Sequence, residues 1–209
     1  MSAGLAADLA ALVPAAGPRF LLGLAGAPAS GKSTLAAELA GAIPRAQAMS
    51  MDGFHLDDGI LEARGHRARK GAPHTFDVAG FCALLRRLRV EDQLYAPAFD
   101  RDLEVSRAGA VEIAADTRLV IVEGNYLLHD TGGWEAVRGL LDLCWFLDVP
   151  EADLIARLEA RWAHHGKSVQ AARHWIESND LPNIRTVAGA GARADRVLSL
   201  TERVDRSVR

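Results

Sequence analysis

A glycine-rich segment followed by a lysine and a serine is the first place in the chain where residue types and spacing could do chemistry. Gly26, four further residues, Gly31, Lys32 and Ser33 form the pattern G-x-x-x-x-G-K-[ST]. Glycines let backbone N–H groups close around phosphate oxygens, the lysine can reach β- and γ-phosphates, and the hydroxyl can bind Mg²⁺. A glycine-rich turn with an incidental lysine is the alternative. An apolar run before the pattern and helix-forming residues after it favour a phosphate-binding loop. The residues expected to bind a nucleotide are Gly26, Ala27, Ala29, Ser30, Gly31, Lys32, Ser33 and Thr34.

Two carboxylates each follow a segment that we predict to be a strand. Asp52 comes after residues 46–51, and Glu123 comes directly after the β-branched residues 120–122. At the carboxyl ends of parallel strands, Asp52 could accept the proton of an attacking hydroxyl, and Glu123 could reach the Mg²⁺ shell. The alternatives are an Asp-Gly turn and an ordinary acid at a strand end. We predict a catalytic base at Asp52 and a metal ligand at Glu123.

Two arginines spaced by four residues would project from one face of a helix. Arg157 and Arg161 could close over a transferring phosphate and stabilise its charge. Asp153 lies four residues before Arg157, so a surface ion pair is the alternative. The same lid could include His164, His165 and Lys167.

A basic stretch over residues 64–70 has two interpretations. Such a stretch is usually solvated, but it could also hold a substrate anion or a product phosphate. His55 is a candidate through its closeness in sequence to Asp52.

The composition of the chain is that of an ordinary globular protein. Its 209 residues are 49% hydrophobic and 24% charged, which fits one domain over residues 1–209 with a small lid at about residues 157–180. The net charge of −3 gives no reason to expect nucleic-acid or membrane binding. Cys82 and Cys144 lie in apolar surroundings, which predicts buried free thiols and a cytoplasmic protein.

The first fourteen residues contain no lysine or arginine and are too short to span a bilayer. We expect a short amphipathic helix there instead of a signal peptide. The residues expected on its apolar side are Leu5, Leu9, Leu12 and Val13.

Short apolar runs alternate with helix-like segments along the chain. Strands are predicted over residues 20–25, 46–51, 120–122, 141–149 and 195–200. Helices are predicted over residues 32–42, 78–88, 134–140, from residue 151 onward and over 168–179, with a loop or hairpin over 93–113. This alternation predicts an α/β fold with a mainly parallel sheet and a ligand site at the carboxyl ends of the strands.

Five segments in this order resemble the pantothenate kinase and uridine kinase family of P-loop kinases. They are residues 26–34, 51–55, 69–77, 122–126 and 146–150, and the likeness extends from about residue 20 to residue 200. The chain looks closest to a bacterial branch described as fructose transport system kinases or pantothenate kinase-like proteins. Residues 123–128 and 179–183 are characteristic of that branch.

The resemblance implies a P-loop NTPase fold: a five-stranded mainly parallel sheet with helices on both faces and a small helical lid. It implies ATP with Mg²⁺, phosphorylation of a small molecule's hydroxyl, and often a homodimer. Asp52 would be the base, Lys32 and Ser33 the phosphate and Mg²⁺ groups, and Glu123 the second acid, with the two arginines in the lid. Residues expected to contact the acceptor are Asp52, His55, Lys70, Arg101, Asn125 and Tyr126.

Two departures from the family pattern bear on the acceptor. Uridine kinases carry an acid two residues before the proline at 73, where this chain has Gly71. Pantothenate kinases carry a Ser-His pair in the segment 99–102, where Arg101 replaces the histidine. Nucleosides and pantothenate are therefore disfavoured. Arg101 and Asp100 could instead contact a polyol, a sugar such as fructose, or an anionic substrate.

Proteins of other classes also bind nucleotides through such a loop. A regulatory switch or a transport accessory protein would bind ATP without phosphorylating an acceptor. The guanine-specificity segment Asn-Lys-x-Asp of switch GTPases does not occur in the sequence. A carboxylate placed as a base favours an acceptor hydroxyl, because GTPases position the attacking water with a glutamine.

Overall fold

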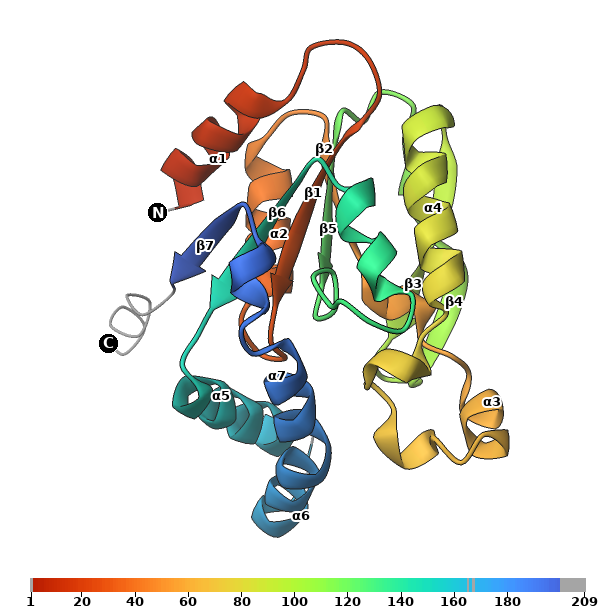
Figure 1. The fold of residues 1–209 in the computed structure, drawn as a ribbon, viewed down its shortest axis with the longest axis vertical. Helices are drawn as coiled ribbons and strands as arrows, with labels where there is room; N and C mark the ends of the chain where they lie inside the picture. Colours follow the sequence, from red (N-terminus) through yellow and green to blue (C-terminus); the bar gives the residue numbers. More distant parts are fainter. Residues whose placement is uncertain (1, 165, 167, 200–209) are drawn as a thin grey trace.

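Five parallel strands form the central sheet of the computed structural model, which describes residues 2–164, 166 and 168–199 (Figure 1). The sheet has the order β2-β5-β1-β6-β7. The strands are β1 (Phe20–Gly26), β2 (Ala46–Ser50), β5 (Leu119–Gly124), β6 (Leu143–Asp148) and β7 (Arg196–Ser199). All six residues of β5 are buried, as expected for a strand covered on both faces. The predicted α/β class and parallel sheet are confirmed. The predicted lid residues His165 and Lys167, and Leu200 of the predicted last strand, lie outside the described residues.

The register of the sheet brings the candidate acid to the phosphate loop. Glu123 of β5 pairs with Leu24 of β1 and with Ser50 of β2. Because all three strands end at the same edge, the loop after β1 and the turn after β2 lie on either side of Glu123.

Helices cover the two faces of the sheet. In Figure 1, α1 (Ser2–Leu12) and α2 (Lys32–Ala42) lie on one side of the strands, and α4 (Val78–Val90) lies on the other. The Asp77 side chain accepts a hydrogen bond from the N–H of Gly80 and caps α4 at its first turn. The predicted helical segment 134–140 consists of two short 3₁₀ turns, Trp134–Ala136 and Arg138–Leu140.

The segment predicted to be a loop or hairpin is a hairpin. The antiparallel strands β3 (Leu94–Asp100) and β4 (Val105–Ile113) form a separate two-stranded sheet beside the 3₁₀ turn η1 (Met51–Phe54). The connection between them carries Arg101 and Glu104 toward the edge where the main strands end.

Two groups of short helices flank the carboxyl ends of the strands in Figure 1. One follows β6 and comprises α5 (Glu151–His164), α6 (Val169–Trp175), the π-helical turn η6 (Ile176–Asp180), α7 (Leu181–Val187) and the 3₁₀ turn η7 (Ala190–Arg193). The other follows η1 and comprises α3 (Asp58–Ala63) with the 3₁₀ turns η2 (Arg67–Arg69) and η3 (Pro73–Thr75). The Ser168 side chain caps α6 by accepting a hydrogen bond from the N–H of Ala171.

The N-terminal helix forms as expected, and three of its four predicted apolar residues face the core. Leu5 and Leu9 are buried and Val13 packs against the core, whereas Leu12 at the end of α1 is 53% exposed. Among the described residues, no helix is long and apolar enough to cross a membrane.

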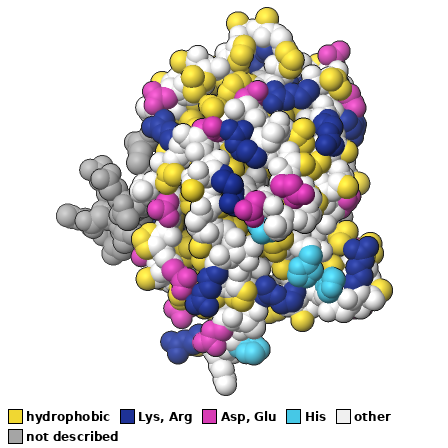
Figure 2. Space-filling view, in the orientation of Figure 1, with side chains coloured by type: hydrophobic (Ala, Val, Ile, Leu, Met, Phe, Trp, Pro, Cys, Tyr) yellow, Lys and Arg dark blue, Asp and Glu magenta, His cyan; other side chains and the backbone are white. Residues whose placement is uncertain are grey.

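The cysteines and the surface agree with the composition. Cys82 and Cys144 are buried free thiols, and burial raises the pKa of Cys144 to about 12. On the face shown in Figure 2, acidic and basic side chains are interspersed.

Candidate active site

The predicted phosphate-binding loop follows β1 and ends at the first residue of α2. Gly26 has φ 155°, and a Cβ atom there would lie 2.9 Å from Ser30 Oγ and 3.0 Å from the Leu147 carbonyl oxygen. Gly31, the N-cap residue directly before α2, has φ 94° and the left-handed conformation. The first N–H groups of α2 have no partners within the helix, so they face the loop's interior as donors for an anion.

Lys32 lies inside this loop. Its Nζ donates hydrogen bonds to the Ala27 carbonyl at 2.8 Å and to Ser30 Oγ at 3.5 Å. Burial lowers the pKa of Lys32, while the negative charges of Glu123 and Asp52 oppose that shift. The amine therefore lies between the loop backbone and two carboxylates, as a group that neutralises phosphate must.

Ser33 and Glu123 lie in contact, as the predicted metal site requires. Ser33 Oγ donates a hydrogen bond to Glu123 Oε1 at 3.2 Å. Burial raises the pKa of Glu123 and the charge of Asp52 raises it further, whereas Lys32 and hydrogen bonds from Ser50 and Ser33 lower it.

This pair of oxygen donors fits Mg²⁺, which prefers oxygen ligands and keeps several waters and phosphate oxygens in its shell. The described residues hold no cluster of three His, Cys, Asp or Glu side chains suited to a metal. Among the described residues, Ser33 and Glu123 would hold the ion beside a nucleotide.

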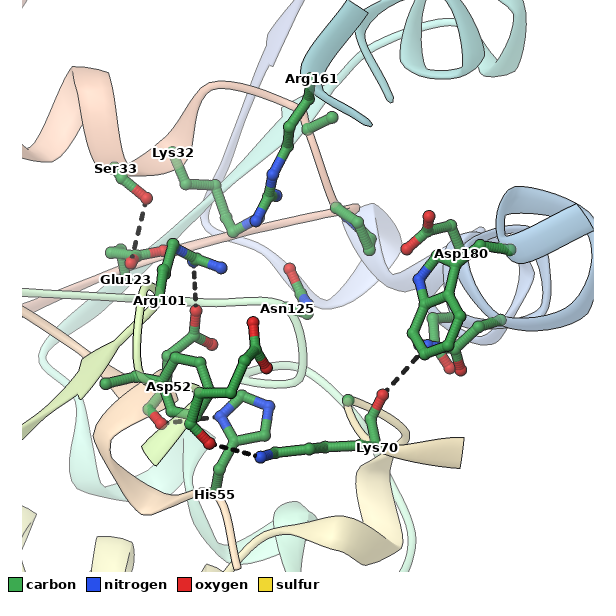
Figure 3. A pocket seen from close by; sticks show the side chains of 18 of the residues that line it. Lys32, Ser33, Asp52, His55, Lys70, Arg101, Glu123, Asn125, Arg161 and Asp180 are labelled. Atoms are coloured by element: carbon green, nitrogen blue, oxygen red, sulfur yellow. Dashed lines mark hydrogen bonds and ion pairs between the residues drawn. The ribbon is translucent and has the colours of Figure 1, made fainter. Parts of the chain in front are cut away.

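Asp52 occupies the turn η1 directly after β2. The N–H of Asp52 donates to Ser50 Oγ at 3.1 Å, and Asp52 Oδ2 accepts a hydrogen bond from Arg101 at 2.7 Å. Arg101 comes from the connection between β3 and β4, and Figure 3 shows it above Asp52 and beside Glu123. Gly53 is required next to this carboxylate, because a Cβ atom there would overlap the Pro97 carbonyl of β3.

His55 and Lys70 line the same cavity but are held by protein groups. The His55 ring packs between Phe76 and Phe99, and its Nδ1 lies 2.7 Å from the Asp52 carbonyl oxygen. Burial lowers the pKa of His55, which favours the neutral ring. Lys70 Nζ donates to Asp58 Oδ1 at 2.6 Å and to the Glu104 carbonyl at 2.7 Å.

Asn125 and Tyr126, which follow Glu123 in the sequence, are both expected to contact the acceptor. Only Asn125 lines the cavity. Tyr126 is fully buried, packs against Phe76 and Trp134, and donates its hydroxyl to the Gly71 carbonyl at 2.6 Å. The prediction of an acceptor contact at Tyr126 is therefore corrected: this side chain supports the segment that contains Gly71.

The two lid arginines have different partners. Arg161 lines the cavity, points toward Lys32 in Figure 3, and lies 5.4 Å from the centre of the Trp162 ring. Burial, followed by the charge of Arg101, lowers the pKa of Arg161. Arg157 instead donates to the carbonyls of Ala29 and Ser30, both at 3.3 Å. The expectation that both arginines face the phosphate therefore differs from the structure, in which Arg157 bonds to the loop backbone and does not line the cavity.

The alternative interpretation of Arg157, a surface ion pair with Asp153, also does not match the structure. Among the ion pairs of the described residues, none joins Arg157 to Asp153.

Sequence reasoning missed the residues that join the lid to the basic stretch. Arg69 donates to the Ser178 carbonyl at 2.7 Å, to Asn179 Oδ1 at 2.8 Å and to Asn183 Oδ1 at 3.1 Å. Asn179 Nδ2 returns a bond to the Lys70 carbonyl at 3.0 Å. Residues 179–183 were the available signal, because they are characteristic of the bacterial branch although the sequence assigns them no role. The π-helical turn that orients them has no clear sequence pattern.

These groups enclose one cavity of about 320 Å³. The phosphate loop, Glu123 and Arg161 line one end, with Asp52 and Asn125 in the middle (Figure 3). The other end is lined by His55, Lys70, Asn179, Asp180 and Asn183. The aromatic residues on its walls are Phe76, Phe99, Trp162 and Trp175. The arrangement can hold an anion at the loop and a second molecule next to a carboxylate.

Sequence comparison finds relatives among kinases, although no family model matches the chain. A protein from Schizosaccharomyces pombe, provisionally named a uridine kinase, is 33% identical over 183 residues, which are 81% of this chain and 78% of that protein. The ATP-dependent kinase-like protein notR' of Aspergillus versicolor is 35% identical over 144 residues, covering 64% of this chain and 84% of its own length.

A solved structure agrees with these relatives. The crystal structure of a protein from Silicibacter sp. TM1040, provisionally named a fructose transport system kinase, is 43% identical with a TM-score of 0.89, covering 95% of this chain and 98% of that chain. Together with the phosphate loop and the parallel sheet, these comparisons show that the chain belongs to the pantothenate kinase and uridine kinase family of P-loop kinases.

Proposed function

We propose that this protein is an ATP-dependent kinase that transfers the γ-phosphoryl group to a hydroxyl of a small molecule. The observation that carries the proposal is the position of Asp52, a carboxylate that shares one cavity with Lys32, Ser33 and Glu123 of the phosphate site. A carboxylate there can take the proton of an attacking hydroxyl, which a protein that only binds nucleotide does not need.

A second cavity supports a nucleotide as the donor. It has a volume of about 190 Å³, begins at Ala27 of the phosphate loop and continues between the end of β6 and the end of α7. Its apolar walls include Phe146, Val149, Ile184 and Val187. Such a slot suits a planar base whose phosphates extend into the loop.

Each protein group has a separate task in the proposed transfer. The loop and Lys32 bind the phosphates, and Arg161 neutralises charge on the transferring group. Asp52, oriented by Arg101, accepts the hydroxyl proton. When bound with ATP at Ser33 and Glu123, Mg²⁺ would supply positive charge to the phosphate oxygens.

The acceptor is a separate question. The Silicibacter relative's name points to fructose, and other relatives are named for uridine or pantothenate. We propose a sugar such as fructose as the first candidate, because the chain departs from both other patterns. Gly71 replaces the acid of the uridine kinase pattern, and Arg101 replaces the histidine of the pantothenate kinase pattern. The alternative, a regulatory or transport accessory protein that binds ATP without an acceptor, predicts no acceptor-dependent turnover.

We further infer a cytoplasmic enzyme, supported by two buried free thiols, that acts as a single kinase domain and forms a homodimer as its resemblance to the family implies.

The test is ADP release with Mg²⁺-ATP and a panel of sugars, polyols, pantothenate and nucleosides. We expect at least one acceptor to raise turnover well above the rate with water. Asp52→Asn should then lower kcat by about 10²–10⁴-fold, as expected for loss of a general base. The matched control is Asp57→Asn, because Asp57 is exposed and caps α3, a role that asparagine preserves. Acceptor-dependent turnover that survives in Asp52→Asn would reject Asp52 as the base.

A further inference from the structure

Arg69 does not line the cavity, but it bridges two segments that do. Its Nη1 donates to the Ser178 carbonyl at 2.7 Å and to Asn179 Oδ1 at 2.8 Å, and its Nη2 donates to Asn183 Oδ1 at 3.1 Å. These acceptors are neutral oxygens of η6 and α7, and the planar guanidinium reaches all three at once, which a lysine amine could not do. Arg69 therefore fixes the position of η6 and the start of α7 relative to η2.

The lid side of this contact leads to Arg161. Asp180 directly follows Asn179 and accepts a hydrogen bond through Oδ2 from Trp162 Nε1 at 2.9 Å. Trp162 follows Arg161 on α5, and the Arg161 guanidinium lies 5.4 Å from the centre of its ring. The position of η6 therefore helps to set the position of Arg161, the cation proposed above for the transferring phosphate.

The other side of the contact leads to Asp52 through the buried residue Lys70 (Figure 3). Asn179 Nδ2 donates to the Lys70 carbonyl at 3.0 Å, and Lys70 Nζ donates to the Glu104 carbonyl at 2.7 Å. Glu104 lies three residues after Arg101 in the connection between β3 and β4. Arg101 in turn donates to Asp52 Oδ2 at 2.7 Å. A continuous path of bonds thus runs from the lid to the proposed base.

The two ends of these paths have to be placed accurately for the proposed reaction. Asp52 acts on the acceptor hydroxyl and Arg161 acts on the phosphoryl group that the hydroxyl attacks. Misplacement of a reacting group by about 1 Å can lower a rate by about a hundredfold. A residue that fixes both ends therefore affects turnover without contacting either substrate.

We propose that Arg69 is a positioning residue that holds Arg161 and Asp52 at the separation needed for phosphoryl transfer. It acts through η6 toward Arg161 and through Asn179 and Lys70 toward Asp52. The proposal rests on the kinase function proposed above and adds to it a role for a residue outside the cavity.

The first experiment measures steady-state kinetics of Arg69→Ala with the best acceptor of the panel. We expect kcat to fall by about 10–100-fold, while the KM for ATP stays within about twofold because the phosphate loop is not touched. Arg69→Lys keeps the charge and can keep one hydrogen bond, so it should recover part of kcat. Arg64→Ala, an exposed residue of the same basic stretch, is the control that should change neither value.

The outcomes separate this proposal from the kinase function. A kcat of Arg69→Ala equal to that of the wild type would overturn the positioning role while upholding the kinase. No acceptor-dependent turnover in the wild type would instead reject the kinase function itself.

The second experiment tests the path through Lys70 with a double-mutant cycle. Lys70→Met removes the amine that reaches the Glu104 carbonyl, and Arg69→Ala removes the contact with the lid. If both act along one path, kcat of the double variant at saturating acceptor should lie within about threefold of the more impaired single variant. Defects that multiply would show independent effects and overturn the path. If Arg69→Ala does not fold, as judged by thermal unfolding, the same cycle is measured with Arg69→Lys.

Discussion

At the scale of single residues, the site is built from charged side chains that lie close to opposite charges. Lys32 lies within the electrostatic influence of both Glu123 and Asp52, and Asp52 is paired with Arg101. Burial makes the charges of Lys32 and Glu123 costly by themselves, and the nearby opposite charges offset part of that cost; Asp52 is partly exposed and Arg101 is exposed. The same burial makes the network sensitive to single substitutions and to pH.

The two lid arginines should give different kinetic defects. Arg161→Ala removes a cation that faces Lys32 in the cavity, so we expect kcat to fall by about a hundredfold or more with little change in the KM for ATP. Arg157→Ala removes hydrogen bonds to the Ala29 and Ser30 carbonyls, so we expect the KM for ATP to rise by about tenfold. Steady-state kinetics of both variants would check this. Identical defects in the two variants would contradict the separate roles.

Glu123 should make stability fall as pH rises. Burial raises its pKa in the native state, so above the unfolded value of about 4.3 the native protein binds more protons than the unfolded chain. Between the unfolded pKa and the raised native pKa of Glu123, the free energy of unfolding therefore decreases as pH rises. The decrease is about 1.4 kcal/mol for each unit by which the native pKa is raised.

Urea unfolding from about pH 4 to 8 would measure this contribution as the difference between wild type and Glu123→Gln. Glu62→Gln, an exposed glutamate of α3, is the control for a glutamate substitution as such. A difference between wild type and Glu123→Gln that does not change with pH would contradict the assignment.

At the scale of elements, the site depends on where the strands end and on two side-chain contacts that join separate elements across those ends. The hairpin β3-β4 places Arg101 on Asp52, and Arg69 joins η2 to residues 178–183. The phosphate loop itself is shaped by the close passage of β6 behind it, since Leu147 contacts the space where a Gly26 side chain would be.

Gly26→Ala should disrupt the loop, whereas Gly41→Ala should not. A methyl group at Gly26 meets Ser30 Oγ and the Leu147 carbonyl, so we expect a loss of about 1–3 kcal/mol in stability and at least a tenfold weaker affinity for ATP. A Cβ atom at Gly41 in α2 meets nothing within 4 Å, so the helix should gain about 0.5–1 kcal/mol. Thermal unfolding and nucleotide titration would check both, and normal ATP affinity in Gly26→Ala would contradict this description of the loop.

At the scale of the whole molecule, the proposed nucleotide and acceptor sites lie at one edge of one sheet, between two groups of helices. A ligand that contacts the loop, β6 and α7 therefore binds the folded protein only, and such binding raises stability by mass action.

Mg²⁺-ATP at about one hundred times its Kd should add about 2.7 kcal/mol and raise Tm by roughly 5–10 °C. Lys32→Ala should lose most of this shift, because the amine inside the loop is absent, whereas Arg64→Ala should retain it. Differential scanning fluorimetry with and without Mg²⁺-ATP measures the shift. An equal shift in Lys32→Ala would show that the nucleotide does not bind in this loop.

Much of this architecture could be predicted because its signals are local. The glycine spacing and the apolar runs depend on residues close in sequence, and the predicted strands formed within a few residues of their expected bounds, whereas the predicted helix 134–140 formed as two 3₁₀ turns. The contact between Ser33 and Glu123 could also be predicted from the sequence, because parallel strands bring their ends together regardless of their separation in the chain.

By itself, then, the sequence determined the α/β fold, the phosphate loop and the residues at the strand ends, because short-range periodicity and glycine geometry encode them. Only the tertiary structure decided which side chains meet across elements. It directed Arg157 to the loop backbone and Arg161 into the cavity, buried Tyr126, and joined Arg101 to Asp52. Those outcomes depend on how each helix is rotated about its axis, on a π-helical turn and on the packing of a hairpin against η1. Contacts between distant segments of the chain set all three.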